Sequence, residues 1–238
     1  MKKVIVFLSF IFLLVGCGKK SDEIVMVTEA GFAPYEFYEN GEVIGVDIEI
    51  SKKIADKLGK KLVIKDVAFD SIINELNSGK ADFAAAGMSI DPERSEKVDF
   101  SIEYITSNQV VVVKKDSDIK SIDDIKDKRI SVQLGTVADT YVTKNYKDAK
   151  INRLKKFLVA AEDVKNNKSD CIVMDAIPAN ELVKSNPELK VLDGILFQDK
   201  YGMAVKKGNK ELLNSINLVL EELIKDGKID EYIIKFSE

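Results

Sequence analysis

Arg94 is the residue whose type and position most directly suggest chemistry. It follows an apolar run, a glycine and an Asp-Pro pair (residues 81–92), an order typical of a buried strand that ends before a short helix. In open α/β sheets, ligands bind at the carboxyl ends of strands. A guanidinium there can hold a carboxylate through two parallel hydrogen bonds. The alternative is a surface ion pair with Glu93 or Glu96, and the strand–glycine–turn order favours the binding role.

Asp175 is the corresponding candidate in the second half of the chain. It follows an apolar run, residues 171–174, which predicts a buried strand, and it precedes a helix that we expect to begin at Pro178. A carboxylate at this place can pair with an ammonium group. It can also cap the helix that follows. The sequence leaves both roles open.

Three further kinds of residue lie in loops after predicted strands. Gly135 and Thr136 precede a predicted helix, whose first N–H groups attract anions, although an ordinary strand-to-helix turn explains them equally well. Phe32 and Phe69 could line a ligand pocket or contact a cation, although a core position is commoner for phenylalanine. Glu29 follows the first predicted strand, and its alternative role is that of a solvated loop residue.

The composition excludes several classes of function. The chain has 238 residues, of which 45% are hydrophobic and 32% charged, as expected for a soluble protein of one or two domains. A net charge of -4 without a long basic block gives no support for nucleic-acid binding. Without histidine there is no Ser–His–Asp or Cys–His nucleophile, and two cysteines leave no plausible zinc site. No glycine-rich phosphate-binding motif is present, so we expect recognition without a cofactor or metal.

The N-terminal residues predict export. Lys2 and Lys3 precede an apolar run, residues 4–15, that would reach roughly 18 Å as a helix, against about 30 Å of bilayer core. This favours a signal peptide over 1–16 rather than a membrane-spanning anchor. Residues 14–17 (LVGC) resemble the lipobox of bacterial lipoproteins, which implies cleavage before Cys17 and lipidation of its thiol. Residues 17–23 would then be a tether.

Strand and helix patterns alternate through the rest of the chain, which predicts an α/β fold with mostly parallel sheets. The expected strands are 24–28, 61–65, 81–86, 109–113, 129–133, 150–154, 170–175, 189–192 and 201–205, with a hairpin turn at Asn40-Gly41. The expected helices are 47–58, one capped by Asp70, one begun by Asp91-Pro92, 119–127 (helix or turn), 137–146, 159–167, 178–185, 209–225 and 229–236. Residue Cys171 is expected to be a small buried hydrophobe.

A weak internal repeat suggests two similar halves. Residues 76–87 and 164–175 both combine a helix end, a lysine, an aspartate two residues later and an apolar strand. Residues 24–32 similarly parallel residues 130–138. Two such halves would form two facing lobes, and the alternative is chance similarity between βαβ units.

Three stretches together resemble the polar amino-acid-binding proteins that serve bacterial ABC importers, which have the type 2 periplasmic-binding-protein fold. They are TEAGFAPYEF (28–37) with GVD (45–47), AGMS through Arg94 to DFS (86–101), and QLGT (133–136), and YGMAV (201–205) resembles the C-terminal return of the family. The motifs are specific only in combination, and they cover nearly all of the mature chain. The resemblance implies a monomer with lobe 1 at 24–104 plus 202–238, lobe 2 at 109–197, and hinges at 104–108 and 197–201.

The resemblance also implies how the backbone of an amino acid is held. The matching arginine of the family binds the α-carboxylate, so Arg94 takes this role, with help from Ser89 and Thr136. The matching aspartate binds the α-ammonium, so Asp175 takes that role together with the carbonyl of Gly87.

The ligand side chain would lie among the remaining motif residues. Phe32 and Phe69 would sandwich it, Glu29 and Gln133 would meet its polar end, and Met88 belongs to the same binding segment. Glutamine binders of the family carry lysine in place of Gln133 and glycine in place of Val137, which argues against glutamine. Glu29 has no compensating lysine visible in the sequence, and a buried carboxylate requires a cation, so arginine or lysine is the expected ligand.

The expected protein is therefore a substrate-binding lipoprotein outside the cytoplasm, in the periplasm or on the cell surface. Its partners would be a polar amino acid and a membrane permease, and lobe closure around the ligand would be the mechanism. One alternative is an enzyme on the same fold resembling cyclohexadienyl dehydratase, with Glu29 or Asp175 as the acid. Another is a sensor or adhesin lipoprotein that does not transport.

Overall fold

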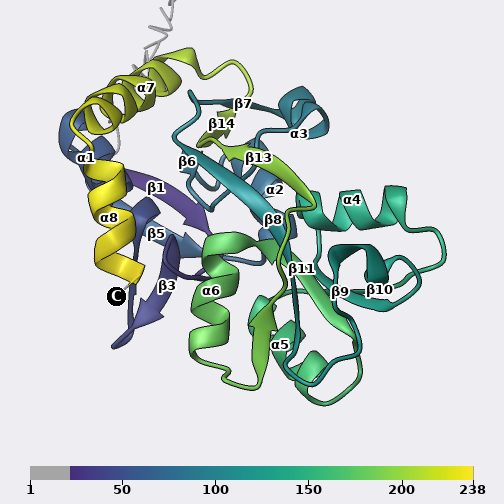
Figure 1. Cartoon of the computed structure of the whole chain (residues 1–238). Coiled ribbons are helices and arrows are strands. Elements are labelled where there is room, and N and C mark those ends of the chain that lie inside the picture. The colour runs from purple at the N-terminus through teal and green to yellow at the C-terminus, as the bar shows by residue number, and fades with distance from the viewer. Residues whose placement is uncertain (1–21, 238) are drawn as a thin grey trace, which may run out of the picture.

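The computed structural model describes residues 22–237, which form two α/β lobes (Figure 1). The predicted signal peptide, the lipidation site Cys17 and most of the predicted tether lie outside the described residues. Among residues 22–237, no helix combines the length and the apolar character that crossing a membrane requires.

Lobe 1 is built on a five-stranded sheet with helices around it. In spatial order its strands are β5 (Lys61–Asp66), β1 (Glu23–Thr28), β6 (Phe83–Ala84), β14 (Ala204–Lys206) and β7 (Val98–Phe100). Its helices are α1 (Val46–Leu58), α2 (Ile72–Asn77) preceded by a 3-10 turn (Phe69–Ser71), α3 (Pro92–Lys97), α7 (Lys210–Lys225) and α8 (Lys228–Ser237). A small antiparallel sheet contains β2 (Gly31–Phe32), β3 (Glu36–Glu39) and β4 (Glu42–Ile44).

Lobe 2 has the second large sheet. Its strands run in the order β10 (Lys150–Leu154), β9 (Arg129–Gln133), β11 (Cys171–Asp175), β8 (Ile105–Lys114) and β12 (Leu189–Val191), and β13 (Phe197–Tyr201) also pairs with β8. Its helices are a 3-10 helix (Ile122–Ile125), α4 (Val137–Asn145), α5 (Phe157–Lys165) and α6 (Ala176–Lys184).

Strands β8 and β13 connect the lobes (Figure 1). They pair antiparallel, with Tyr201 opposite Ile105, and β13 leads through Gly202 into β14 of lobe 1. The sheets are consequently mixed. The βα units pair in parallel, as predicted, whereas β8 pairs antiparallel with β11, β12 and β13, and β14 pairs antiparallel with β6 and β7.

Apolar periodicity explains most of the packing. The buried stripe of α7, which includes Ile216 and Leu220, joins a core cluster with α1. All residues of β11 are buried, and Cys171 is fully inaccessible, which confirms its predicted core position. The predicted Asn40-Gly41 hairpin is also confirmed, since both residues have positive φ, 52° and 86°, between β3 and β4.

Several predicted elements are wrong in detail. Asp70 does not cap a helix, because it lies inside the 3-10 turn that precedes α2. The single strand predicted for 201–205 is two strands in different sheets, and a Cβ on the intervening Gly202 would lie 2.8 Å from the side chain of Ile90. Helix α6 begins at Ala176, before Pro178.

Candidate functional site

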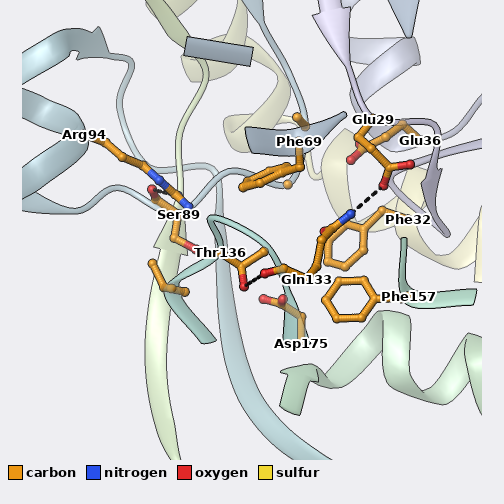
Figure 2. Close-up of a pocket in the computed structure, with 13 residues that line it drawn as sticks. Glu29, Phe32, Glu36, Phe69, Ser89, Arg94, Gln133, Thr136, Phe157 and Asp175 are labelled. Atoms are coloured by element: carbon orange, nitrogen blue, oxygen red, sulfur yellow. Dashed lines mark hydrogen bonds between the residues drawn. The ribbon is translucent and has the colours of Figure 1, made fainter. Parts of the chain in front are cut away.

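A cavity lies between the lobes, where β1, β6, β9 and β11 end (Figure 2). Among the residues that line it are all of the predicted ligand-binding residues except Met88. The lining also contains Glu36, Ala86, Val137 and Phe157. Between Asp22 and Ser237, no group of three or more acidic, cysteine or histidine side chains is placed to hold a metal ion.

Arg94 lies at one end of this cavity and is only 8% exposed. Asp91 caps α3 and pairs with Arg94 Nε at 3.0 Å, so the ion-pair partner is neither Glu93 nor Glu96. Nη1 donates to the carbonyl of Ser89 at 2.6 Å, and Nη2 donates to the carbonyl of Gly135 in lobe 2 at 2.9 Å. The guanidinium also lies 5.3 Å from the Phe69 ring centroid. These contacts fix its plane toward the cavity.

Asp175 ends β11 and is 7% exposed. It stands at the N-cap position of α6, but its side chain makes no capping hydrogen bond, so the capping role predicted as an alternative is wrong. Its carboxylate instead accepts hydrogen bonds from Ser107 at 2.7 Å and from the Tyr201 hydroxyl. Burial raises the pKa of Asp175, and the hydrogen bonds from Tyr201 and Ser107 oppose that rise.

Asp199, on the connecting strand β13, is a residue that the sequence did not single out. It accepts a hydrogen bond from the Ser89 hydroxyl and thereby ties the Arg94 segment to the connecting strand. Burial and the nearby Asp175 raise the pKa of Asp199 to about 6, while Arg94 lowers it. Only the position of Asp199 within a predicted hinge could have drawn attention to it.

Glu29 follows β1 and is 2% exposed. Gln133 Nε2 donates to Glu29 Oε2 at 3.0 Å and to the carbonyl of Lys155 at 2.8 Å (Figure 2). Lys156 Nζ lies 3.2 Å from Glu29 Oε1, close enough for an ion pair but without the direction of a hydrogen bond. The expectation that Glu29 lacks a compensating lysine is therefore wrong.

Glu36 is a second carboxyl group in the cavity wall, close to Glu29 (Figure 2). It is 1% exposed, and its Oε2 has no hydrogen-bond partner among the described residues. Burial and the neighbouring Asp47 raise the pKa of Glu36 well above its usual range.

Asp47 accepts hydrogen bonds from Gly87 N–H at 2.9 Å and from the Tyr104 hydroxyl at 2.7 Å, and burial raises its pKa to about 6. Glu36 lies in the motif PYEF and Asp47 lies in the motif GVD. The sequence therefore contained a signal for both carboxyl groups that was not used.

Aromatic rings form the apolar wall. Phe32 is 8% exposed and stacks on Phe157 of lobe 2 with centroids 5.7 Å apart, so it belongs both to the core and to the cavity (Figure 2). Phe69 lies beside Arg94, and no ring contact joins it to Phe32 within residues 22–237. Phe157 escaped the sequence analysis because its helix was expected to begin at Val159.

Thr136 and Met88 have clear structural roles. Thr136 caps α4 by accepting the Asp139 N–H at 3.3 Å, and its hydroxyl donates to the carbonyl of Gln133 at 2.8 Å. Met88 is 1% exposed and packs in an apolar cluster of lobe 1, outside the lining of the cavity. Met88 was predicted to be a ligand-binding residue, but its side chain does not line the cavity.

Comparisons with known proteins place these features in context. The family model of the bacterial extracellular solute-binding proteins, family 3, matches residues 24–238. The chain is 30% identical to the arginine-binding extracellular protein ArtP of Bacillus subtilis over 92% of this chain and 91% of that protein. It is 33% identical to ABC transporter arginine-binding protein 1 of Escherichia coli, over 87% of each. A solved ancestral arginine-binding protein bound to glutamine superposes with a TM-score of 0.86 at 41% identity, covering 92% and 99% of the two chains.

Proposed function

The chain belongs to the bacterial extracellular solute-binding proteins, family 3, and on that premise we propose that it delivers an amino acid, with arginine favoured, to an ABC importer. The named relatives from Bacillus subtilis and Escherichia coli are arginine-binding proteins. The observation that carries the proposal is the arrangement of the cavity, in which Arg94 and Asp175 line one part and the carboxyl groups of Glu29 and Glu36 lie together at the other end.

The backbone of the amino acid accounts for one charge pair. We assign the α-carboxylate to Arg94, whose guanidinium is buried and held in a fixed plane by backbone carbonyls. We assign the α-ammonium to Asp175, a buried carboxylate that already has two hydroxyl donors and lies across the cavity from Arg94 (Figure 2). A zwitterion satisfies both groups without leaving a buried charge unpaired.

The remaining carboxyl groups support a cationic side chain. Glu29 and Glu36 lie together at the other end of the cavity, and Glu36 Oε2 is an acceptor without a partner among residues 22–237. A guanidinium carries five N–H donors in a plane, so it can satisfy several such oxygens at once. Phe32 and Phe157 supply an apolar surface for the aliphatic part of the side chain.

We propose that the lobes close around the ligand by bending near residues 104–108 and 197–201. Ligand contacts from both lobes would then stabilise the closed form more than the open form.

The family is extracellular, and we further propose that residues 1–16 direct export and that a lipid on Cys17 anchors the protein beside its permease. We propose a binding role rather than catalysis, because Arg94 and Asp175 together match the two charges of an amino-acid backbone and the named relatives are binding proteins.

Calorimetric titration of residues 22–238 tests this function, after unfolding and refolding to remove carried-over ligand. We expect arginine to bind in the micromolar range or tighter and to raise the melting temperature, since a ligand that binds only the native state stabilises it. Lysine, histidine, glutamine and cystine are the comparison ligands. Binding of none of them, or turnover of prephenate or arogenate, would contradict the proposal.

A further inference from the structure

Lys156 makes an ion pair that joins the two lobes beside the cavity. It precedes α5 in lobe 2, and its Nζ lies 3.2 Å from Oε1 of Glu29, which follows β1 in lobe 1. The Lys156 side chain is 45% exposed, whereas that of Glu29 is 2% exposed. Lys156 is not part of the cavity lining, so it approaches the buried carboxylate from the solvent side.

The surrounding contacts hold Lys156 in that position. Gln133 donates to Glu29 and to the carbonyl of Lys155, so it binds the lobe 1 carboxylate and the loop that carries Lys156 at the same time. Asp66 of lobe 1 lies near enough to raise the pKa of Lys156 further. Glu29 and Asp66 of lobe 1 thus both raise the pKa of this lysine of lobe 2.

This contact depends on the relative position of the lobes. Glu29 and Lys156 belong to different lobes, so separation of the lobes breaks the ion pair and returns both groups to water. In the arrangement of the lobes described above, Glu29 is 2% exposed, and a buried carboxylate without a cation is strongly disfavoured. A cation attached to the protein removes that penalty without help from the ligand.

We propose that Lys156 is a built-in counter-cation for Glu29 and is thereby a specificity-determining residue: it allows the closed form to hold uncharged polar side chains as well as cationic ones. The inference rests on the proposed function, because it assumes an amino-acid ligand with its side chain toward Glu29. Without Lys156, only a cationic side chain could neutralise Glu29 in the closed form.

The test compares arginine with citrulline, its uncharged isostere, by calorimetry on refolded protein. Lys156→Met should weaken citrulline binding about 10-fold and arginine binding less than about 3-fold, because only citrulline leaves Glu29 without a cation. Lys156→Arg should keep the wild-type ratio of the two affinities. The matched control is Lys155→Met, which removes the same charge from the adjacent exposed residue.

If the ratio of arginine affinity to citrulline affinity is the same in Lys156→Met as in wild type, the proposal is overturned. It is also overturned if Lys155→Met changes this ratio as much as Lys156→Met does. If the wild-type protein binds no amino acid, the proposed function fails and small-angle scattering of the ligand-free proteins decides the role of Lys156. Loss of the cross-lobe pair should then give a larger radius of gyration in Lys156→Met than in Lys155→Met. Equal radii would reject the cross-lobe role.

Discussion

The hydroxyl of Tyr201, at the end of the connecting strand β13, lies 2.5 Å from Asp175 at the end of β11. Ser107 of the other connecting strand donates to the same carboxylate oxygen. The proposed ammonium site is therefore built partly from the strands that join the lobes. Its geometry depends on the same segments that we propose bend when the lobes separate.

Replacement of Arg94 tests the proposed carboxylate site. Arg94→Ala should reduce affinity for every amino acid at least about 100-fold, because it removes a bidentate, charged donor from a buried position. The fold should survive, as judged by circular dichroism and a cooperative melt. Arg129→Ala is the control, since Arg129 pairs with Asp170 away from the cavity. Normal amino-acid affinity in Arg94→Ala would reject the site assignment.

Asp175→Asn separates the proposed binding role from helix capping. The amide keeps the shape of the side chain and removes its charge, so we expect affinity for amino acids to fall about 100-fold. Far-ultraviolet circular dichroism should show an unchanged helix content, because the carboxylate makes no capping hydrogen bond. An unaltered dissociation constant, measured by calorimetry, would exclude a contact with the α-ammonium.

Glu29→Gln tests the charge selectivity of the side-chain site. We expect arginine affinity to fall about 10-fold more than citrulline affinity, because arginine is the only one of the two ligands whose side chain forms an ion pair with Glu29. The exposed Glu39→Gln on β3 is the control for the loss of one acidic group. Equal weakening of both ligands would show that Glu29 does not select by charge.

Asp47 should make the folded protein less stable as pH rises. Burial raises its pKa from 3.8 to about 6, so between these values the folded state binds more protons than the unfolded state. The free energy of unfolding therefore contains a contribution that decreases as pH rises from about 4 to about 6 and is constant above that range. Denaturant titrations of wild type and Asp47→Asn should differ in the slope of the unfolding free energy against pH over this interval. An equal slope in the two proteins would contradict the assignment.

The sequence was sufficient to predict that Arg94 and Asp175 lie where strands of the two lobes end, and both line the cavity, because each comes after a recognisable buried strand at the start of a helix. The same local order predicted the α/β fold and most of its elements. Contacts between distant segments could not be predicted in this way. Gln133 and Glu29 are 104 residues apart in sequence, and Ser89 and Asp199 are 110 apart, so no local pattern links them. The Lys156 ion pair belongs to the same class.

The contacts of Arg94 also set a limit on which ligands are acceptable. A guanidinium has five N–H donors. In Arg94, the Nε–H faces Asp91, one N–H of Nη1 donates to the carbonyl of Ser89, and one N–H of Nη2 donates to the carbonyl of Gly135. Two N–H donors remain, which equals the number that one carboxylate accepts side by side. Agmatine, which is arginine without its carboxylate, would leave these two N–H donors of Arg94 buried and without an acceptor. The site should thus exclude decarboxylated amines even when their guanidinium fits the opposite end.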